Sequence, residues 1–111
     1  MSDTTKFPGE DHELFYWFFR HDDESKPVVL WMNGGPGSSS MFGLFLENGP
    51  LRVVQNGNDF TVSRADKSWA DDYHVIYIDQ PVNTGFSYAN KSLTSMQDGA
   101  DEFVKFVVGF F

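Results

Sequence analysis

The residues best suited to chemistry form a glycine-rich segment that directly follows a short apolar run. The segment reads Asn33-Gly34-Gly35-Pro36-Gly37-Ser38-Ser39, and its three glycines let backbone N–H groups approach a ligand that any Cβ would hold away. Clustered backbone donors bind anions, either as a phosphate cradle or as an oxyanion hole. The segment lacks the G-x-x-x-x-G-K-S/T spacing of a Walker loop and the G-x-G-x-x-G spacing of a dinucleotide site. An oxyanion hole is therefore favoured over a phosphate site, and a plain tight turn is the alternative without function.

A second candidate for chemistry is Ser87, which lies in the segment Gly85-Phe86-Ser87-Tyr88-Ala89. This segment has the small-x-Ser-x-small pattern of a nucleophile elbow. Such an elbow follows its strand directly, whereas residues 80–84 separate Ser87 from the apolar run at 75–79. The preferred interpretation is a loop that packs beside the glycine-rich segment.

The remaining titratable residues are expected to lie at the surface. His12, His21 and His74 flank expected strands, so we interpret them as surface histidines rather than general bases. The acidic runs at 22–24 and 71–72 lack the spaced oxygen ligands of a calcium loop and are expected to be solvated turns. No metal site and no cofactor are predicted.

Three strands are expected to position the glycine-rich segment. Residues 13–20 are dense in aromatic side chains, and residues 28–32 and 75–79 are apolar and rich in β-branched side chains, which predicts two fully buried strands. The long loop and helix between these two runs allow a crossover, so strands 28–31 and 75–78 are expected side by side. The fold class predicted is a mixed α/β sheet with a crossover helix.

Two helices complete the expected fold. Residues 41–47 predict a short helix, and residues 95–110 predict an amphipathic one. The apolar face of the longer helix is expected to hold Met96, Ala100, Phe103, Val104, Val107 and Phe111. Residues 1–12 are expected to be a polar, frayed lead-in, and residues 51–72 mostly loop with short strands, anchored by Trp69.

Composition narrows the class of protein. The chain has 111 residues with 41% hydrophobic and 17% aromatic content, which is typical of one globular domain. Eight basic residues are scattered among sixteen acidic ones, for a net charge of −8, and this balance argues against nucleic-acid binding. The absence of cysteine excludes a disulfide framework and a cysteine nucleophile within this chain. No run reaches the roughly 18 apolar residues of a membrane span, so no membrane contact is expected.

Four motifs occur in order between residues 13 and 111. They are LFYWFF at 14–19, VLWMNGGPG at 29–37, GLFLENGP at 43–50, and DQPV at 79–82 with GFSY at 85–88. In these motifs the chain resembles the N-terminal segment of the serine carboxypeptidase family, which has the α/β-hydrolase fold. One donor of the oxyanion hole in that fold comes from a loop after an early strand.

The resemblance assigns roles to the glycine-rich segment. It implies that the backbone N–H of Gly35 is one oxyanion donor. It also implies that the side chain of Asn33, beside Gly34, binds the free α-carboxylate of a peptide substrate. Peptides with a free C-terminus are therefore the expected partners.

The resemblance also assigns roles to the helix that follows. Glu47 is expected behind Asn33 in the family's hydrogen-bond network, and Phe42 and Leu46 are expected to line the pocket for the C-terminal side chain of the substrate. The family commonly has cysteine where this chain has Ser38, so a disulfide that ties the loop elsewhere is missing here.

The family's nucleophile lies in a G-E-S-Y-A-G elbow just after the position where this sequence ends, and its Asp and His come later. The chain is therefore expected to stop before the elbow, to lack the triad, and to be inactive alone. The function implied is that of a serine-type carboxypeptidase, which releases C-terminal amino acids by acyl-enzyme chemistry. A carboxypeptidase-like acyltransferase and a non-catalytic truncated product are the alternatives. The resemblance suggests a lysosomal, vacuolar or secreted protein.

Overall fold

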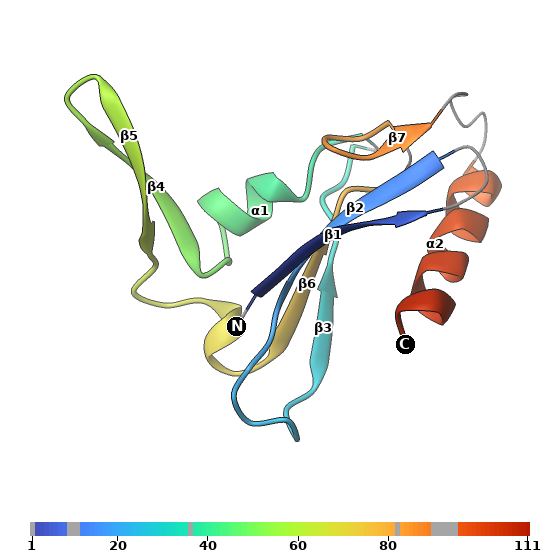
Figure 1. The fold of residues 1–111 in the computed structure, drawn as a ribbon, viewed down its shortest axis with the longest axis horizontal. Helices are drawn as coiled ribbons and strands as arrows, with labels where there is room; N and C mark the ends of the chain where they lie inside the picture. The colour runs from blue at the N-terminus through green and yellow to red at the C-terminus, as the bar shows by residue number, and fades with distance from the viewer. Residues whose placement is uncertain (1, 9–11, 36, 82, 90–95) are drawn as a thin grey trace.

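A five-stranded mixed sheet forms the body of the protein (Figure 1). The computed structural model describes residues 2–8, 12–35, 37–81, 83–89 and 96–111. Four strands lie in the order β1 (Ser2–Pro8), β2 (His12–Phe19), β6 (His74–Ile78) and β3 (Val28–Trp31), and β7 (Tyr88–Ala89) pairs with β2. β2 runs antiparallel to β1 and β6, whereas β3 runs parallel to β6. The prediction that strands 28–31 and 75–78 are neighbours in one sheet is confirmed.

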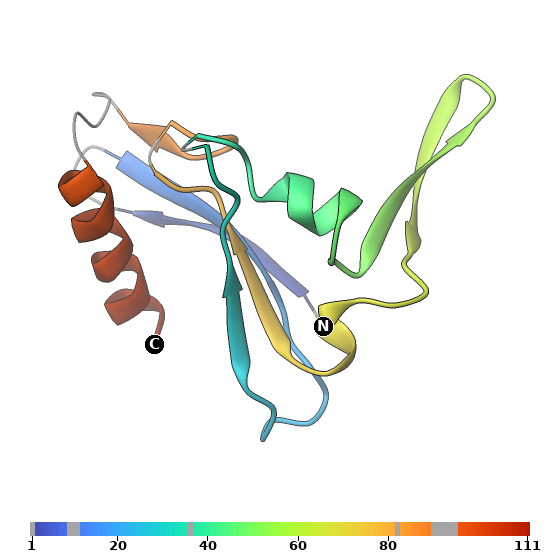
Figure 2. The same cartoon turned by 180° about the vertical axis from the view of Figure 1, so that it is seen from behind.

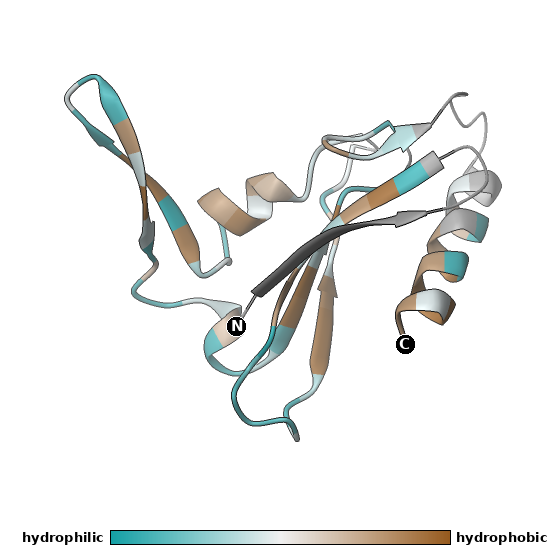
Figure 3. Ribbon diagram, viewed as in Figure 1, coloured by the Kyte–Doolittle hydropathy of each residue, from teal (hydrophilic) through white to brown (hydrophobic). Residues whose placement is uncertain are grey.

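The aromatic content of β2 is explained by packing on both faces of the sheet, since successive side chains of a strand point to opposite faces. On one face Leu14, Tyr16 and Phe18 pack with Ile76, Ile78 and Phe106. On the other face Phe15, Trp17 and Phe19 pack with Met41, Leu44, Val75 and Tyr77. Hydrophobic residues accordingly run along the central strands in Figure 3. The sheet is thus the middle layer between two helices.

Helix α2 (Met96–Phe110) packs on the sheet as predicted and covers the first of these faces. Of the residues predicted to face the core, Phe103 and Val107 do so. Phe103, Phe106, Val107 and Phe110 pack on the sheet, and Phe106 is fully buried. The rings of Phe106 and Phe110 lie 5.3 and 5.2 Å from the ring of Tyr16. Ala100, Val104 and Phe111 were predicted to face the core and are exposed; the side chain of Met96 lies outside the described part of the chain. The contact with Tyr16 selects the stripe 103, 106, 107 and 110, which satisfies helical spacing equally well.

Two predictions about strands were wrong. Ser2–Pro8, expected as a frayed lead-in, pairs along its whole length with β2 as strand β1, because a strand is held by backbone hydrogen bonds that polar residues also form. β3 was expected to be fully buried, yet Val28 is exposed and the other three residues are half-buried. The reason is topological, since β3 is the end strand of the described sheet and has β6 on one side only.

The segment 51–72, expected to be mostly loop with short strands, contains a regular hairpin. β4 (Leu51–Asn56) and β5 (Asp59–Arg64) pair antiparallel and are joined by the two-residue turn Gly57-Asn58, a loop length typical of hairpins. The hairpin projects away from the sheet (Figures 1 and 2). All residues of β5 are exposed, so the segment lacks the continuous apolar run by which a buried strand is recognised in a sequence.

Two short helical elements flank the hairpin along the chain. The short helix expected before it was predicted correctly and is α1 (Met41–Leu46). A 3-10 turn, η1 (Trp69–Asp71), lies between the hairpin and β6. The ring of Trp69 packs edge-on to Trp31 at 5.3 Å, so η1 is anchored to the end of β3.

Candidate functional site

The glycine-rich segment leaves the carboxyl end of β3 and leads into α1. In open α/β sheets ligands bind beyond the carboxyl ends of the parallel strands. Gly35 has a φ of 122°, and a Cβ there would lie 3.2 Å from the backbone nitrogen of Ser38. Only glycine meets both conditions without strain. Gly34 and Gly35 are exposed, and the Ser38 N–H donates to the carbonyl of Gly34 at 3.2 Å. Pro36 lies outside the described residues.

The amide of Asn33 has a defined orientation. Its Oδ1 accepts hydrogen bonds from Nε1 of Trp31 at 2.7 Å and from the backbone nitrogen of Gly43 at 3.3 Å. The indole N–H is only a donor, so the atom that faces it must be the amide oxygen. Among the described residues none accepts a hydrogen bond from Nδ2. Within the described structure both N–H donors of the Asn33 amide are therefore without an acceptor.

Gly43 makes this orientation possible, and the sequence analysis missed it. A Cβ at Gly43 would lie 2.2 Å from Nε1 of Trp31 and 3.0 Å from Oδ1 of Asn33. The missing side chain lets α1 approach both residues closely. A glycine inside an apolar helical segment was the available signal, because such a glycine usually has a packing reason.

The three residues predicted on α1 do not converge on Asn33. Phe42 and Leu46 share one face of the helix but are 52% and 63% exposed. Glu47 is also exposed; its carbonyl accepts from Nη2 of Arg52 at 2.9 Å, and no hydrogen bond joins its carboxylate to Asn33 within the described structure. Their roles in a pocket and a hydrogen-bond network stay predictions.

The turn after α1 is held by a buried phenol. The hydroxyl of Tyr77 donates to Oδ1 of Asn48 at 2.8 Å. Burial raises the pKa of Tyr77 well above its usual range, because the charged form loses its hydration. Tyr77 therefore acts as a neutral donor that ties this turn to β6.

A buried carboxyl group, Asp79, lies directly after β6 and was also missed as a site residue. Its Oδ1 accepts from the hydroxyl of Ser39 at 2.7 Å and from the backbone nitrogen of Ser40 at 2.8 Å. Asp79 and Ser40 are both buried. An acidic residue that directly follows a buried strand was the sequence signal, since buried carboxylates are almost always paired or hydrogen-bonded.

Ser87 has a structural environment. It is 7% exposed, its hydroxyl donates to the carbonyl of Asp79 at 2.6 Å, and it accepts from the backbone nitrogen of Phe15 at 2.8 Å. No histidine contacts the hydroxyl among the described residues. The loop also lies beside the glycine-rich segment, because a Cβ at Gly85 would lie 2.8 Å from Oγ of Ser39. The preferred interpretation, a packed loop, is confirmed.

His21 and His74 lie at the other end of the sheet from the glycine-rich segment. His74 opens β6 and is 5% exposed, so its prediction as a surface residue was wrong. Its Nδ1 accepts from the backbone nitrogen of His21 at 2.8 Å, a contact that only pairing of β2 with β6 creates. The side chain of His12 lies outside the described part of the chain. Among the described residues no three His, Cys, Asp or Glu side chains group as metal ligands.

The acidic runs are solvated turns, as predicted. Asp22, Asp23 and Glu24 are exposed. Hydrogen bonds from the side chain and backbone of Ser25 lower the pKa of Asp23. The carboxylate of Asp71 accepts from the backbone nitrogen of Ser68 at 3.0 Å, which closes a capping box at η1.

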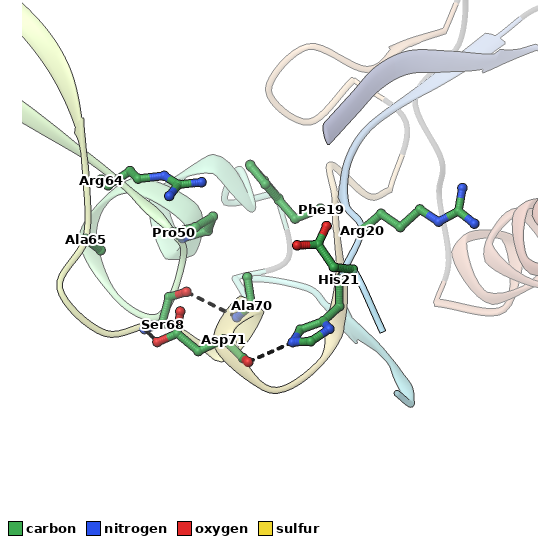
Figure 4. A pocket seen from close by; sticks show the side chains of 10 residues that line it. Phe19, Arg20, His21, Pro50, Arg64, Ala65, Ser68, Ala70 and Asp71 are labelled. Carbon is green, nitrogen blue, oxygen red and sulfur yellow. Dashed lines mark hydrogen bonds between the residues drawn. The ribbon is translucent and has the colours of Figure 1, made fainter. Parts of the chain in front are cut away.

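A cavity of about 370 Å³ lies away from the glycine-rich segment, between the base of the hairpin and the end of β2 (Figure 4). Phe19, Arg20, His21, Asp22, Pro50, Arg64, Ala65, Ser68, Ala70 and Asp71 line it. Several of its polar groups bind one another, for example His21 Nε2 and the carbonyl of Asp71 at 3.0 Å. It contains none of the predicted site residues, so the loop remains the better candidate.

No described helix has the length and apolar character needed to cross a membrane.

The resemblance carried by the sequence motifs extends over nearly the whole chain. Residues 5–111 match the serine carboxypeptidase family. The chain belongs to this family. It is 50% identical over 88 residues to carboxypeptidase Y homolog A of Phaeosphaeria nodorum, and the match covers 78% of this chain and 16% of that protein.

Two further relatives agree. Carboxypeptidase Y homolog A of Ajellomyces capsulatus is 45% identical over 103 residues, or 91% of this chain and 18% of that protein. A carboxypeptidase Y homolog of Arthroderma benhamiae is 44% identical over 100 residues, or 88% of this chain and 20% of that protein. The chain thus spans about a fifth or less of the length of these relatives.

Proposed function

We propose that this chain supplies the oxyanion and carboxylate-binding loop of a serine-type carboxypeptidase with an α/β-hydrolase fold. The complete protein would release C-terminal amino acids from peptides through an acyl-enzyme. Family membership and a mixed sheet with helices on both faces support the proposal. The observation that carries it is the Asn33 amide, whose oxygen is held by Trp31 and Gly43 while its two N–H donors stay available within the described structure.

The Asn33 donors suit a carboxylate. An amide N–H is a neutral donor that recognises a free α-carboxylate without the fixed charge of arginine. Because Oδ1 is occupied, the side chain needs no reorientation when the ligand arrives. A preorganised donor loses little entropy on binding, which favours affinity. Selectivity for peptides with a free C-terminus follows because the bonded group is the carboxylate itself.

Gly35 would stabilise the oxygen of the scissile carbonyl group. Its backbone N–H lies two residues beyond Asn33 on the same loop, so the two groups can meet the carboxylate of the C-terminal residue and the scissile carbonyl oxygen of the residue before it. In the proposed reaction a serine hydroxyl outside these 111 residues attacks the scissile carbonyl carbon. The carbonyl oxygen then gains negative charge, and the Gly35 N–H would stabilise it.

Replacement of Asn33 tests the proposal in the complete protein. Asn33→Ala should lower kcat/KM for peptides with a free carboxylate by about 10- to 150-fold, the equivalent of the roughly 1.5–3 kcal/mol of a hydrogen bond to a charged group. C-terminally amidated peptides should be affected little. Gln55→Ala, on the exposed hairpin, is a matched amide control that should change neither rate. Equal losses on free and amidated peptides would remove the carboxylate-binding role.

A second variant separates binding from folding. Asn33→Asp keeps an oxygen for the donors of Trp31 and Gly43 but replaces the N–H donors with a second oxygen. It should discriminate against free carboxylates more strongly than Asn33→Ala does, because like charges repel.

Product analysis completes the test: transfer of the acyl group to an added alcohol in preference to water would indicate an acyltransferase.

A further inference from the structure

We infer that Asp79 is a positioning residue that holds the glycine-rich loop in its active shape through Ser40. The inference rests on the proposed function, because the shape it protects is that of the oxyanion and carboxylate-binding loop. Asp79 lies outside the loop itself and follows the central strand β6. It therefore connects the loop to the most buried part of the sheet.

The carboxyl group of Asp79 is fully buried and is bound from two sides. Oδ1 accepts from the hydroxyl of Ser39 at 2.7 Å and from the backbone nitrogen of Ser40 at 2.8 Å. Oδ2 accepts from the backbone nitrogen of Phe86 at 3.0 Å. Burial of a carboxyl group is costly unless donors compensate it, so these three bonds make its position well defined.

Ser40 carries this constraint back to the start of the loop. Its hydroxyl accepts from the backbone nitrogen of Asn33 at 3.1 Å and donates to the carbonyl of Ile78. The backbone of Ser40 is thus bound to Asp79, and its side chain is bound to Asn33 and β6. Both ends of the loop, Asn33 and Ser40, are fixed to the same place on the sheet.

The second side of the carboxyl group depends on Gly85. A Cβ at Gly85 would lie 2.3 Å from Oδ2 of Asp79, and its φ is 53°. The absence of a side chain therefore lets Gly85 and Phe86 lie beside the carboxyl group of Asp79. The ring of Phe86 packs on Phe15 of β2 at 5.2 Å, which anchors this segment to the sheet.

The expected consequence is catalytic as well as structural. Loss of the Asp79 carboxylate would leave the buried N–H of Ser40 without its acceptor, and an unsatisfied buried donor is costly. The loop would then shift to satisfy it, and a displacement of about 1 Å of a positioned group can cost about 10²-fold in rate. The groups displaced would be the Asn33 amide and the Gly35 N–H.

Ser40 and Ser87 form a matched pair that separates positioning from stability. Both are buried, both donate to a backbone carbonyl at the end of β6, and both accept from a backbone N–H. The N–H bound by Ser40 belongs to Asn33 in the loop, whereas the N–H bound by Ser87 belongs to Phe15 in β2. Alanine at either position removes the same kinds of bond.

The experiment compares Ser40→Ala, Ser87→Ala and Asp79→Ala in the complete protein. Thermal unfolding, kcat/KM on a blocked dipeptide and hydrogen exchange of the backbone amides 33–40 are measured. We expect similar losses of stability for the two alanine variants. We expect kcat/KM to fall at least about tenfold, with faster exchange at the hydrogen-bonded amides of Asn33 and Ser38, only in Ser40→Ala and Asp79→Ala.

Each outcome supports or overturns the positioning role. Equal catalytic losses in Ser40→Ala and Ser87→Ala, or unchanged exchange in Ser40→Ala, would overturn the inference. If Asp79→Ala does not fold, the matched serine pair still gives the answer. If the unsubstituted protein cleaves no peptide, the proposed function fails, and the exchange rates alone still show whether Asp79 and Ser40 hold the loop.

Discussion

The glycine-rich loop and the β4–β5 hairpin hold their backbones in opposite ways. The loop has no regular structure, yet its ends are bound to buried groups, Asp79 and Ser40. The hairpin has a complete antiparallel ladder, yet Val53, Phe60 and Val62 are exposed. One segment is irregular and tied to the core, and the other is regular and separate from it.

This difference shows that regular structure and tertiary anchoring are independent. A ladder needs only backbone groups and a suitable turn, so the hairpin forms without a core beneath it. An irregular loop satisfies few of its own backbone groups, so side chains from distant segments must supply partners. Function concentrates on loops of the second kind, because a rigid scaffold can place them accurately.

Gly35→Val should give the largest effect and tests the loop side of this comparison. A side chain at a φ of 122° would strain the backbone and move the N–H. In the complete protein kcat should fall about 10²- to 10³-fold for free and amidated peptides alike, as expected for one lost oxyanion donor. Steady-state kinetics with both substrates measures this.

Gly57→Val in the hairpin turn is the matched control for strain. Gly57 also has a positive φ, 65°, and no atom lies within 4 Å of the position that a Cβ would take there. The kcat of this variant should remain at the level of the unsubstituted protein. A comparable loss of kcat in both variants would mean that strain, and not a lost donor, lowers the rate.

Gly43→Ala should give an intermediate effect on stability. The new Cβ would collide with Nε1 of Trp31, and overpacking of this kind costs about 1–3 kcal/mol in the free energy of unfolding. Urea denaturation measures it. Gly34→Ala is the control, since nothing lies within 4 Å of its Cβ position. Equal free energies for the two variants would contradict the close approach of α1 to Trp31.

Phe60→Ser should give the smallest effect and tests the hairpin side. Phe60 is 68% exposed, and surface substitutions of this kind change the free energy of unfolding by about 0.5 kcal/mol or less. Denaturation and kcat of the complete protein should both stay close to those of the unsubstituted form. A loss above about 1 kcal/mol would show that the hairpin packs against other residues of the complete protein, and the contrast with the loop would then disappear.

The sequence by itself determined the local features of this protein. Runs of apolar residues predicted strands β3 and β6 and their adjacency, and helical spacing predicted α1 and α2. The glycine-rich segment was recognisable because glycine adopts a positive φ, such as the one at Gly35, without strain. Each of these signals lies within a few consecutive residues.

The tertiary structure decided the features that join distant residues. Asp79 binds Ser40 across 39 positions, and Ser87 binds Phe15 across 72. The stripe of α2 that faces the sheet depends on Tyr16, and the burial of His74 depends on the pairing of β2 with β6. A local pattern indicates which element a segment forms, but it does not indicate which side chains from distant segments bind or cover that element. For this reason the loop was visible in the sequence, whereas the groups that hold it became visible only in the fold.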